Sequence, residues 1–287
     1  MSPGPLHPGP MRCGPTRRRS TAIVVAHPDD ETLWLSSVIA AADRVVLSFG
    51  AVFERPDLSE ARRRAIAALP LAGLIHLAIP ESGVGFAIDG AQAEPTSTGI
   101  RIDDAAVRRR YESNYSQLID ALRGMLAGFR HVYTHNPWGE YGHPEHIQVH
   151  RAVAALQGEL GYTVWFSNYV GPASWPLARR LSREVRWSRR RIVRPDLAAA
   201  RRLMRVYRQH GAWTWSVAHR WPVFETLYGE PPAGASAPRH PLSGEWLLDA
   251  ARLRWWSPPW PYARRRLPPV GAGLGSDRDV YAAPRPG

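Results

Sequence analysis

Residues 26–31 read Ala-His-Pro-Asp-Asp-Glu and bring one imidazole and three carboxylates together in six positions. The motif follows a short apolar run at residues 22–26 and precedes a stretch with helix-like spacing. Folds with an α/β sheet place their chemistry where a strand gives way to a helix, at the carboxyl edge of the sheet. His27 and Asp30 are suitable zinc ligands, and a spare carboxylate beside them is what a metal-dependent hydrolase needs as a base.

A second cluster of reactive side chains lies at residues 134–146, which read Thr-His-Asn-Pro-Trp-Gly-Glu-Tyr-Gly-His-Pro-Glu-His. This segment also follows an expected strand and opens an expected helix. Pro144 suits the first helical position, so we expect His143 at the cap and His146 in the first turn.

The two clusters together predict a metal site. The ends of the first and fourth strands of a doubly wound sheet can be adjacent, across the point where the strand order reverses. His27, Asp30 and His146 would then form a triad of two histidines and one carboxylate, with a fourth position open for water as in catalytic zinc sites. His150 shares the helix face of His146 and is the alternative third ligand.

Strands and helices that alternate along the chain would position these side chains. Apolar strands are expected at residues 21–26, 44–49, 74–78, 131–134 and 163–166, and helices at residues 32–41, 58–69, 103–126 and 144–157. Near-continuous apolar strands are typical of parallel sheets buried on both faces. We therefore predict an α/β fold with a Rossmann-like, mostly parallel sheet and helices on both faces.

The domain organisation is expected to be simple. Residues 1–20 are predicted to be a disordered tail, residues 21–257 a single α/β domain, and residues 258–287 a tail rich in Pro, Arg and Gly. The long loop at residues 80–102 is predicted to be a binding loop or lid. After residue 170 the pattern is less regular, with one or two strands at 183–193 and a helix at 195–210 that has Pro195 in its first turn.

Composition excludes some classes of site. The one cysteine, Cys13, allows neither a disulfide framework nor a cysteine-based zinc site. The net charge is +12 and every basic residue is arginine, in short scattered clusters rather than on one element. No apolar run approaches the roughly 18 residues of a membrane span. Residues 17–26 begin with arginines like a secretion signal, but their apolar part is too short for one. We expect a cytoplasmic protein with no nucleic-acid partner.

The two motifs resemble those of the PIG-L/LmbE-like family of zinc-dependent N-deacetylases. The resemblance covers about residues 21–170, and also includes a helix rich in Arg and Glu at residues 60–69 and the Thr134-His135 pair that leads into the second motif. It implies that a metal (zinc, with iron(II) as the alternative) binds the three triad residues His27, Asp30 and His146. It further implies that Asp29 is the base that deprotonates the attacking water.

The resemblance also assigns two further roles. His143 matches the histidine that stabilises the oxyanion or protonates the leaving amine. Tyr141 matches a tyrosine that in some members reaches toward the substrate carbonyl. The chemistry is consistent, because an O–H or N–H donor at the developing oxyanion favours the tetrahedral intermediate.

Two positions depart from the family pattern. Ser36 and Ser37 stand where the family usually has a glycine pair, so the first helix is expected to pack less closely. Glu145 replaces the usual aspartate of the second motif and is one methylene longer, which would alter the geometry of His143 if Glu145 orients it.

Of the twelve tryptophans, Trp138 lies inside the second motif and is expected to line a saccharide pocket, since aromatic faces stack on sugar rings. The substrate implied by the resemblance is a small amino-sugar conjugate that loses an N-acetyl or short N-acyl group. Two alternatives stay open: the same chemistry on a non-sugar amide, and a protein that binds polyanions or nucleic acid and has a non-catalytic metal site. The sequence leaves the oligomeric state open.

Overall fold

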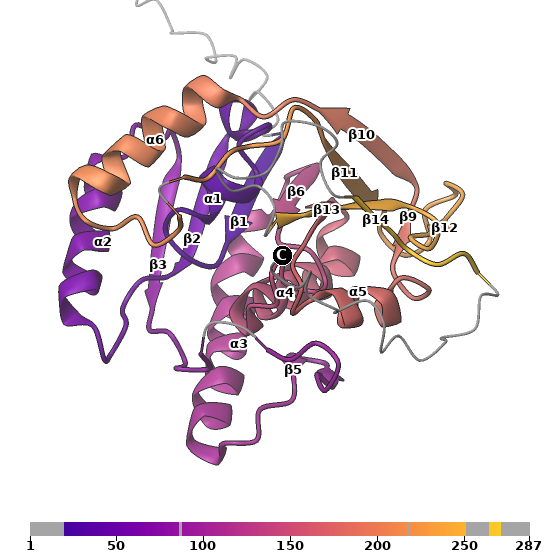
Figure 1. Ribbon diagram of the computed structural model, residues 1–287, viewed down its shortest axis with the longest axis horizontal. Coiled ribbons are helices and arrows are strands. Elements are labelled where there is room, and N and C mark those ends of the chain that lie inside the picture. Colours follow the sequence, from indigo (N-terminus) through magenta and orange to yellow (C-terminus); the bar gives the residue numbers. More distant parts are fainter. Residues whose placement is uncertain (1–19, 86–87, 217, 251–263, 271–287) are drawn as a thin grey trace, which may run out of the picture.

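A seven-stranded sheet forms the centre of the protein (Figure 1). The computed structural model describes residues 20–85, 88–216, 218–250 and 264–270. Across the sheet the strand order is β10-β11-β7-β6-β1-β2-β3. The strands are β1 (Thr21–Val25), β2 (Arg44–Phe49), β3 (Leu74–Ile79), β6 (His131–Thr134), β7 (Thr163–Ser167), β10 (Arg189–Val193) and β11 (Glu225–Glu230). The run from β7 to β3 is parallel, and β11 is antiparallel to both of its neighbours. The predicted α/β fold with a mostly parallel sheet is confirmed.

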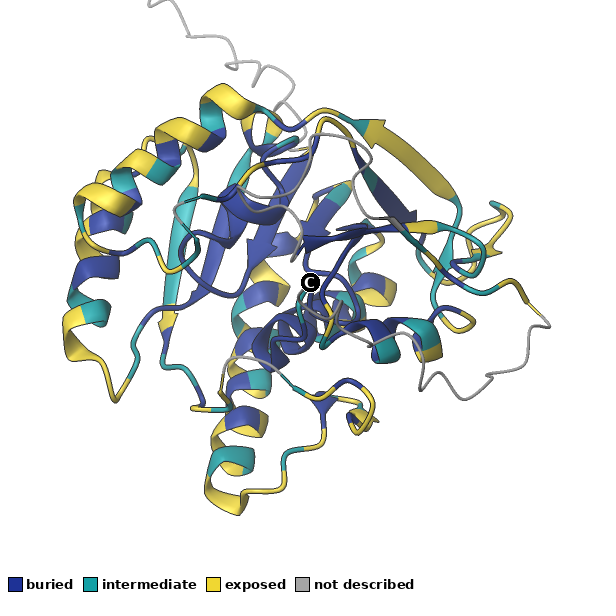
Figure 2. Ribbon diagram, viewed as in Figure 1, coloured by how far each residue is buried: buried dark blue, intermediate teal, exposed yellow. Residues whose placement is uncertain are grey.

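Helices cover both faces of the sheet (Figure 2). Ala22 and Val24 of β1 face α3 (Ala105–Leu126) and α4 (Pro144–Leu160), whereas Ile23 and Val25 face the layer of α1 (Asp30–Trp34), α2 (Pro56–Ala68) and α6 (Leu197–Gln209). All five residues of β1 are buried, which explains why its sequence is apolar throughout rather than alternating.

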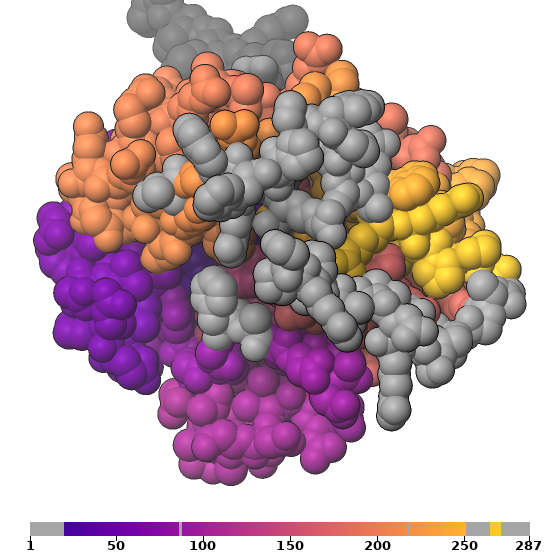
Figure 3. Space-filling model, viewed as in Figure 1, coloured from indigo at the N-terminus to yellow at the C-terminus, as the bar shows by residue number. Residues whose placement is uncertain are grey.

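Helix α6 comes from the part of the chain where the sequence pattern is weak. Its apolar side is buried against α1 and α2, and its arginines point outward. Figure 3 shows α6, in orange, lying directly against the purple region of α2. The helix predicted at residues 195–210 is thus confirmed, but Asp196 is its cap and accepts a hydrogen bond from Ala199 N, so Pro195 lies before the helix rather than in its first turn.

The first predicted helix is the least accurate prediction. Helix α1 ends at Trp34, and a separate 3₁₀ turn spans Ile39–Ala41, where the sequence predicted one helix over residues 32–41. Ser36 and Ser37 lie in the break. The other predicted helices and the five predicted strands are confirmed to within a few residues.

The C-terminal third adds small sheets beside the main one. Helix α5 (Trp175–Leu181) precedes β9 (Arg186–Trp187), so residues 183–193 form two strands. The other short strands are β4 (Pro95–Thr96), β5 (Gly99–Ile100), β8 (Tyr169–Val170), β12 (His240–Pro241), β13 (Trp246–Asp249) and β14 (Arg264–Arg266). Part of the predicted C-terminal tail therefore belongs to the domain, because β14 pairs with β13 and Leu267 is buried. The predicted tail at residues 1–20, apart from Ser20, and the boundary at 257 lie outside the described residues.

Two further features concern the whole fold. Strand β1 pairs with β6 in the register Val24 to Thr134, so the residues that follow both strands meet at one edge of the sheet.

Within the described part of the chain, no helix combines the length and the apolar character needed to cross a membrane.

A buried carboxyl group in this fold gives a testable pH dependence of stability. Glu225 is 1% exposed and accepts a hydrogen bond of 2.6 Å from the Tyr169 hydroxyl. Burial raises the pKa of Glu225 from 4.5 to about 7. Because the folded-state pKa lies above the unfolded-state value, the unfolded chain loses its proton first as the pH rises, and stability falls between pH 4.5 and about 7.

Glu225→Gln keeps an acceptor for Tyr169 and removes this titration. From pH 5 to pH 8 the wild type should lose about 2–3 kcal/mol of its free energy of unfolding through this titration, and the variant should not show this loss. Chemical denaturation of both proteins at the two pH values measures the change. A difference between the two proteins that stays constant with pH would contradict it.

Candidate metal centre and active site

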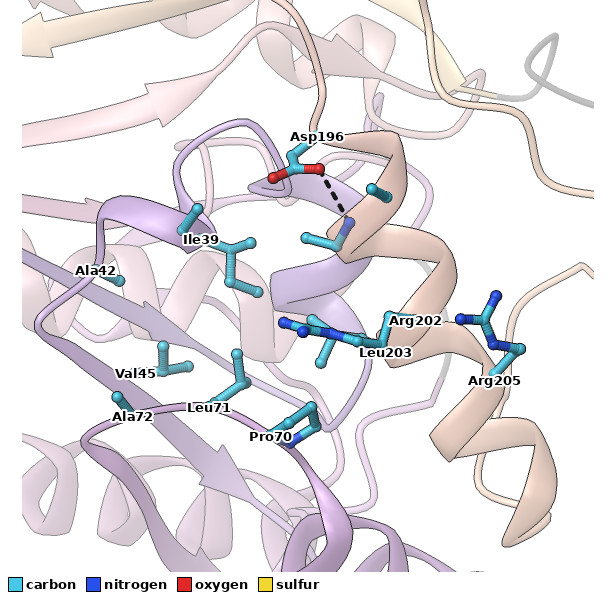
Figure 4. Close-up of a pocket in the computed structure, with 13 residues that line it drawn as sticks. Ile39, Ala42, Val45, Pro70, Leu71, Ala72, Asp196, Arg202, Leu203 and Arg205 are labelled. Carbon is cyan, nitrogen blue, oxygen red and sulfur yellow. Dashed lines mark hydrogen bonds between the residues drawn. The ribbon is translucent and has the colours of Figure 1, made fainter.

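Among the pockets lined by described residues, two are compared as possible places for the chemistry. The larger, of about 520 Å³, lies beside α6 and is shown in Figure 4. Its wall is mainly apolar, with Ile39, Val45 and Leu203, and its one carboxylate, Asp196, caps α6. The smaller, of about 270 Å³, is lined by residues of both sequence motifs, including His27, Asp29, Asp30, Tyr141 and His143. The reactive side chains therefore select the smaller pocket.

Three predicted metal ligands converge beside this pocket. His27 Nδ1 lies 3.3 Å from Asp30 Oδ2 and 3.3 Å from His146 Nε2, and the last two atoms are 3.2 Å apart. Four ligands placed tetrahedrally at about 2.0–2.1 Å from zinc are about 3.3–3.4 Å from one another. The three atoms therefore have the spacing of three corners of a zinc coordination sphere.

Two carboxylates fix the outward sides of the histidine rings. Glu145 Oε2 lies 2.8 Å from His27 Nε2, and Glu140 Oε2 lies 2.8 Å from His146 Nδ1. A proton on each outward nitrogen leaves the inward nitrogen of each ring with its lone pair, facing the Asp30 carboxylate. Three such electron-rich atoms at these distances have the chemistry and the spacing to hold a divalent metal ion.

Charge around the triad favours a cation in the same way. Burial alone would lower the pKa of His27, but the carboxylates of Glu81, Asp30 and Glu145 raise it to about 10. The pKa of Glu140 falls to about 2 because His135 and His146 outweigh the effect of burial. These acidic groups are arranged to hold positive charge inside the protein.

The structure corrects the role considered for Glu145. Its carboxylate binds His27, and its other oxygen accepts hydrogen bonds from Ser82 N at 2.6 Å and Ser82 Oγ at 2.7 Å. Its backbone N–H donates to His143 Nδ1 at 3.2 Å. Its extra methylene thus bears on the orientation of a metal ligand. The start of the predicted binding loop, at Glu81 and Ser82, is also anchored at the site.

Two other buried histidines do not complete the triad. His135 Nε2 accepts a hydrogen bond from Ala26 N at 2.8 Å, so its lone pair is already used although Asp30 lies 3.5 Å away. His150, the alternative third ligand, hydrogen-bonds the His135 carbonyl oxygen through Nδ1 at 2.8 Å. Among the described residues, the geometry favours His146 over His150.

Asp29, the predicted base, lines the pocket together with His27 and Asp30. Its φ of 101° is unusual for a residue with a side chain, and such strain is most often found at functional sites. Burial, reinforced by the charge of Asp30, raises the pKa of Asp29 to about 8, while hydrogen bonds from Thr214 act against this shift. A carboxylate with a pKa near neutrality is well matched to proton transfer.

His143 lines the pocket and caps α4. The backbone N–H of Glu145 donates to its Nδ1, so the neutral ring carries its proton on Nε2. Burial, with the nearby His27 and His146, holds the pKa of His143 well below 6.5. A bound cation would act in the same direction, so His143 is neutral and a hydrogen-bond donor.

The aromatic residues are placed differently from the prediction. Tyr141 lines the pocket, with its ring 5.3 Å from that of His146. Trp138 does not reach it, because its side chain is 0% exposed and its Nε1 donates to the Tyr169 carbonyl oxygen at 2.7 Å. The prediction that Trp138 binds substrate is therefore corrected. Trp215 lines the pocket instead, 5.0 Å from the ring of Tyr141.

Several residues of the site have contacts that the sequence does not give. Glu140 and Glu145 lie within the second motif, but only the fold shows which histidine each one binds. Arg62 and Glu81 pair across the pocket from α2 and the loop after β3. Thr214 and Trp215 come from the weakly patterned C-terminal third, within the Trp-Thr-Trp sequence of residues 213–215.

Comparison with known proteins bears on the first half of the chain. Residues 22–157 match the family model PIG-L: GlcNAc-PI de-N-acetylase. The 1D-myo-inositol 2-acetamido-2-deoxy-alpha-D-glucopyranoside deacetylase of Corynebacterium kroppenstedtii is 28% identical over 159 residues. The aligned segment is 49% of this chain and spans 41% of the length of that relative.

Solved structures show more distant similarity. The zinc-inhibited form of teicoplanin deacetylase Orf2 has a TM-score of 0.48 and 13% identity, over 75% of this chain and 100% of that chain. The A40926 pseudoaglycone deacetylase Dbv21 has a TM-score of 0.43 and 17% identity, over 76% of this chain and 100% of that chain.

Proposed function

We propose that the chain, whose residues 22–157 form a PIG-L family domain, is a metal-dependent N-deacetylase acting on an amino-sugar conjugate. The observation that carries the proposal is the convergence of three metal-ligating atoms beside Asp29 in one pocket. The family match alone would not support the proposed function, since function resides in the site rather than in the fold.

His27, Asp30 and His146 would hold the metal, with zinc as the first candidate and iron(II) as the second. When bound there, a divalent cation polarises a carbonyl group and lowers the pKa of water toward about 7. The remaining chemistry belongs to side chains of this chain.

Asp29 acts as the general base. As the water oxygen bonds to the amide carbon, one water proton passes to the carboxylate of Asp29. The carbon–nitrogen bond then breaks, the nitrogen keeps the electron pair, and Asp29 returns the proton to it. Acetic acid and the free amine leave, the acid then gives its remaining proton to the solvent to become acetate, and Asp29 is again ionised.

His143 stabilises the oxyanion in this scheme. Its neutral ring presents Nε2–H as a donor toward the pocket, and such a donor is most effective where negative charge develops on the carbonyl oxygen. Its lowered pKa favours this role over protonation of the leaving amine. Tyr141, on the same wall, closes the site around the carbonyl.

An amino sugar fits the remaining walls of the pocket. Its volume of about 270 Å³ is close to the lower end of the range of ligand pockets, about 300–1,000 Å³, and suits a single ring whose aglycone extends outward. Trp215 offers an aromatic face, and Arg62 and Glu81 offer polar groups for hydroxyls. The relative from Corynebacterium, whose name describes an acetamido sugar substrate, supports the same class.

The polyanion-binding alternative does not account for these observations. It rests on the net charge of +12 alone and gives no purpose to a buried, strained carboxylate beside three converging ligand atoms. The non-sugar amide alternative uses the same residues and is separated by assay.

The test is release of acetate by the zinc-loaded protein from an N-acetylglucosamine glycoside and from a matched N-acetyl amino acid. We expect turnover of the glycoside and little of the amino acid. The reverse preference would favour the non-sugar amide, and no turnover of either substrate above the background without enzyme would contradict the proposed activity.

Trp215 should contribute to binding of the sugar rather than to the chemical step. Trp215→Ala is expected to raise KM for the glycoside about two- to tenfold, because a stacked aromatic contact contributes about 0.5–1.5 kcal/mol. Trp215→Phe keeps an aromatic face and should show a smaller rise. Steady-state kinetics of the two variants provides the check, and an unchanged KM in Trp215→Ala would remove Trp215 from the sugar site.

A further inference from the structure

The backbone of Asp29 is held in its strained conformation by a buried hydrogen-bond chain. Asp29 N donates to Glu31 Oε2 at 3.2 Å. The other oxygen of Glu31 accepts hydrogen bonds from Thr32 Oγ1 at 2.6 Å and from the Tyr207 hydroxyl at 3.0 Å. Glu31 and Tyr207 are fully buried, so α6 braces the turn that presents Asp29.

The side chain of Asp29 is held separately, by Thr214. The backbone N–H and the hydroxyl of Thr214 both donate to Asp29 Oδ2, at 3.1 and 2.8 Å. Among the residues that the structure describes, none donates a hydrogen bond to Oδ1. One carboxylate oxygen is thus fixed, and the other is left to exchange a proton.

Thr214 lies on a segment that is itself well anchored. Trp215 Nε1 donates to His219 Nδ1 at 3.1 Å, and Trp221 Nε1 donates to the Thr32 carbonyl oxygen of α1 at 2.9 Å. The ring of Trp215 also packs edge-on against Trp34, at 5.3 Å. The segment after α6 is therefore attached to α1, the helix that follows Asp29. This attachment keeps Thr214 beside Asp29.

We infer that Thr214 is a positioning residue of the active site, which holds Asp29 Oδ2 so that Oδ1 is aimed at the water to be deprotonated. The inference rests on the proposed function for the identity of the reaction. It extends that function to a residue outside the segment 22–157 that matches the family, so the C-terminal third would complete the catalytic apparatus. Correct aim matters because small displacements of a catalytic group cost large factors in rate.

Three variants test the inference. Thr214→Val keeps the β-branched shape and the backbone donor and removes the hydroxyl donor, and it should lower kcat about 10- to 100-fold with KM changed less than about threefold. Thr214→Ser restores the hydroxyl and should recover kcat to within about threefold. Ser216→Ala removes a hydroxyl of the same segment. This hydroxyl accepts a hydrogen bond from Ala218 N and does not contact Asp29, so the variant should behave as the wild type.

Because Thr214 is exposed at the pocket rim, these substitutions are expected to leave folding intact. Wild-type kcat in Thr214→Val, or an equal loss in Thr214→Ser, would overturn the inference. Crystal structures of the variants give a readout that needs no activity. The Asp29 carboxylate should rotate in Thr214→Val and not in Thr214→Ser, and an unmoved carboxylate would refute the positioning role even if the protein proved to have another substrate.

Discussion

Asp29→Asn is expected to lower kcat for amide hydrolysis by about 10²–10⁴-fold while the protein keeps its metal. The substitution removes the oxygen that accepts the proton and leaves the three metal-ligating atoms in place. Asparagine tolerates positive φ better than most residues, so the backbone at 101° should persist, whereas alanine would add strain. Steady-state kinetics and metal analysis of the same preparation provide the measurement.

The decisive comparison for Asp29 is between its two readouts. Low kcat with wild-type metal content supports a base that does not bind the metal. Full activity in Asp29→Asn would remove Asp29 from the role of base. Loss of metal together with activity would instead make Asp29 part of the metal site.

His27→Ala is expected to abolish both metal binding and activity. The substitution removes one of three ligands and leaves the buried Glu145 carboxylate without its partner on Oε2. The wild type should hold close to one equivalent of zinc or iron, and the variant less than about a tenth of that after dialysis. Elemental analysis of the two proteins measures the difference.

His150→Gln is the matched control for this experiment. His150 is a buried histidine on the same helix as His146, but it contacts the His135 carbonyl oxygen rather than the triad. The control should keep its metal. Equal and negligible metal in the wild type and in His27→Ala would contradict the proposed centre. Loss of metal in His150→Gln would indicate that His150, and not His146, is the third ligand.

The parallel sheet and the identity of the triad residues were accessible from local sequence. Apolar runs such as residues 21–26 can be satisfied only by burial on both faces, and helices between them force parallel pairing. His-Pro-Asp-Asp after one strand and His-Pro-Glu-His after another then place ligands at a common edge, which the pairing of β1 with β6 realises. The break in the first helix could not be predicted from the sequence. The helix propensities of the residues near Ser36 are small free energies, and tertiary packing outweighs them.

Sequence by itself determined which residue types could meet, since the proposed metal ligands and base follow strands whose ends can lie side by side in a doubly wound sheet. Only the tertiary structure decided which carboxylate orients which histidine, that Trp138 is buried while Trp215 lines the pocket, and that Thr214 reaches Asp29. The physical reason is distance along the chain. Contacts within a turn or a strand end follow from local geometry, whereas hydrogen bonds between residues 29 and 214 depend on how α6 and the segment after it pack across the sheet, which no local pattern encodes.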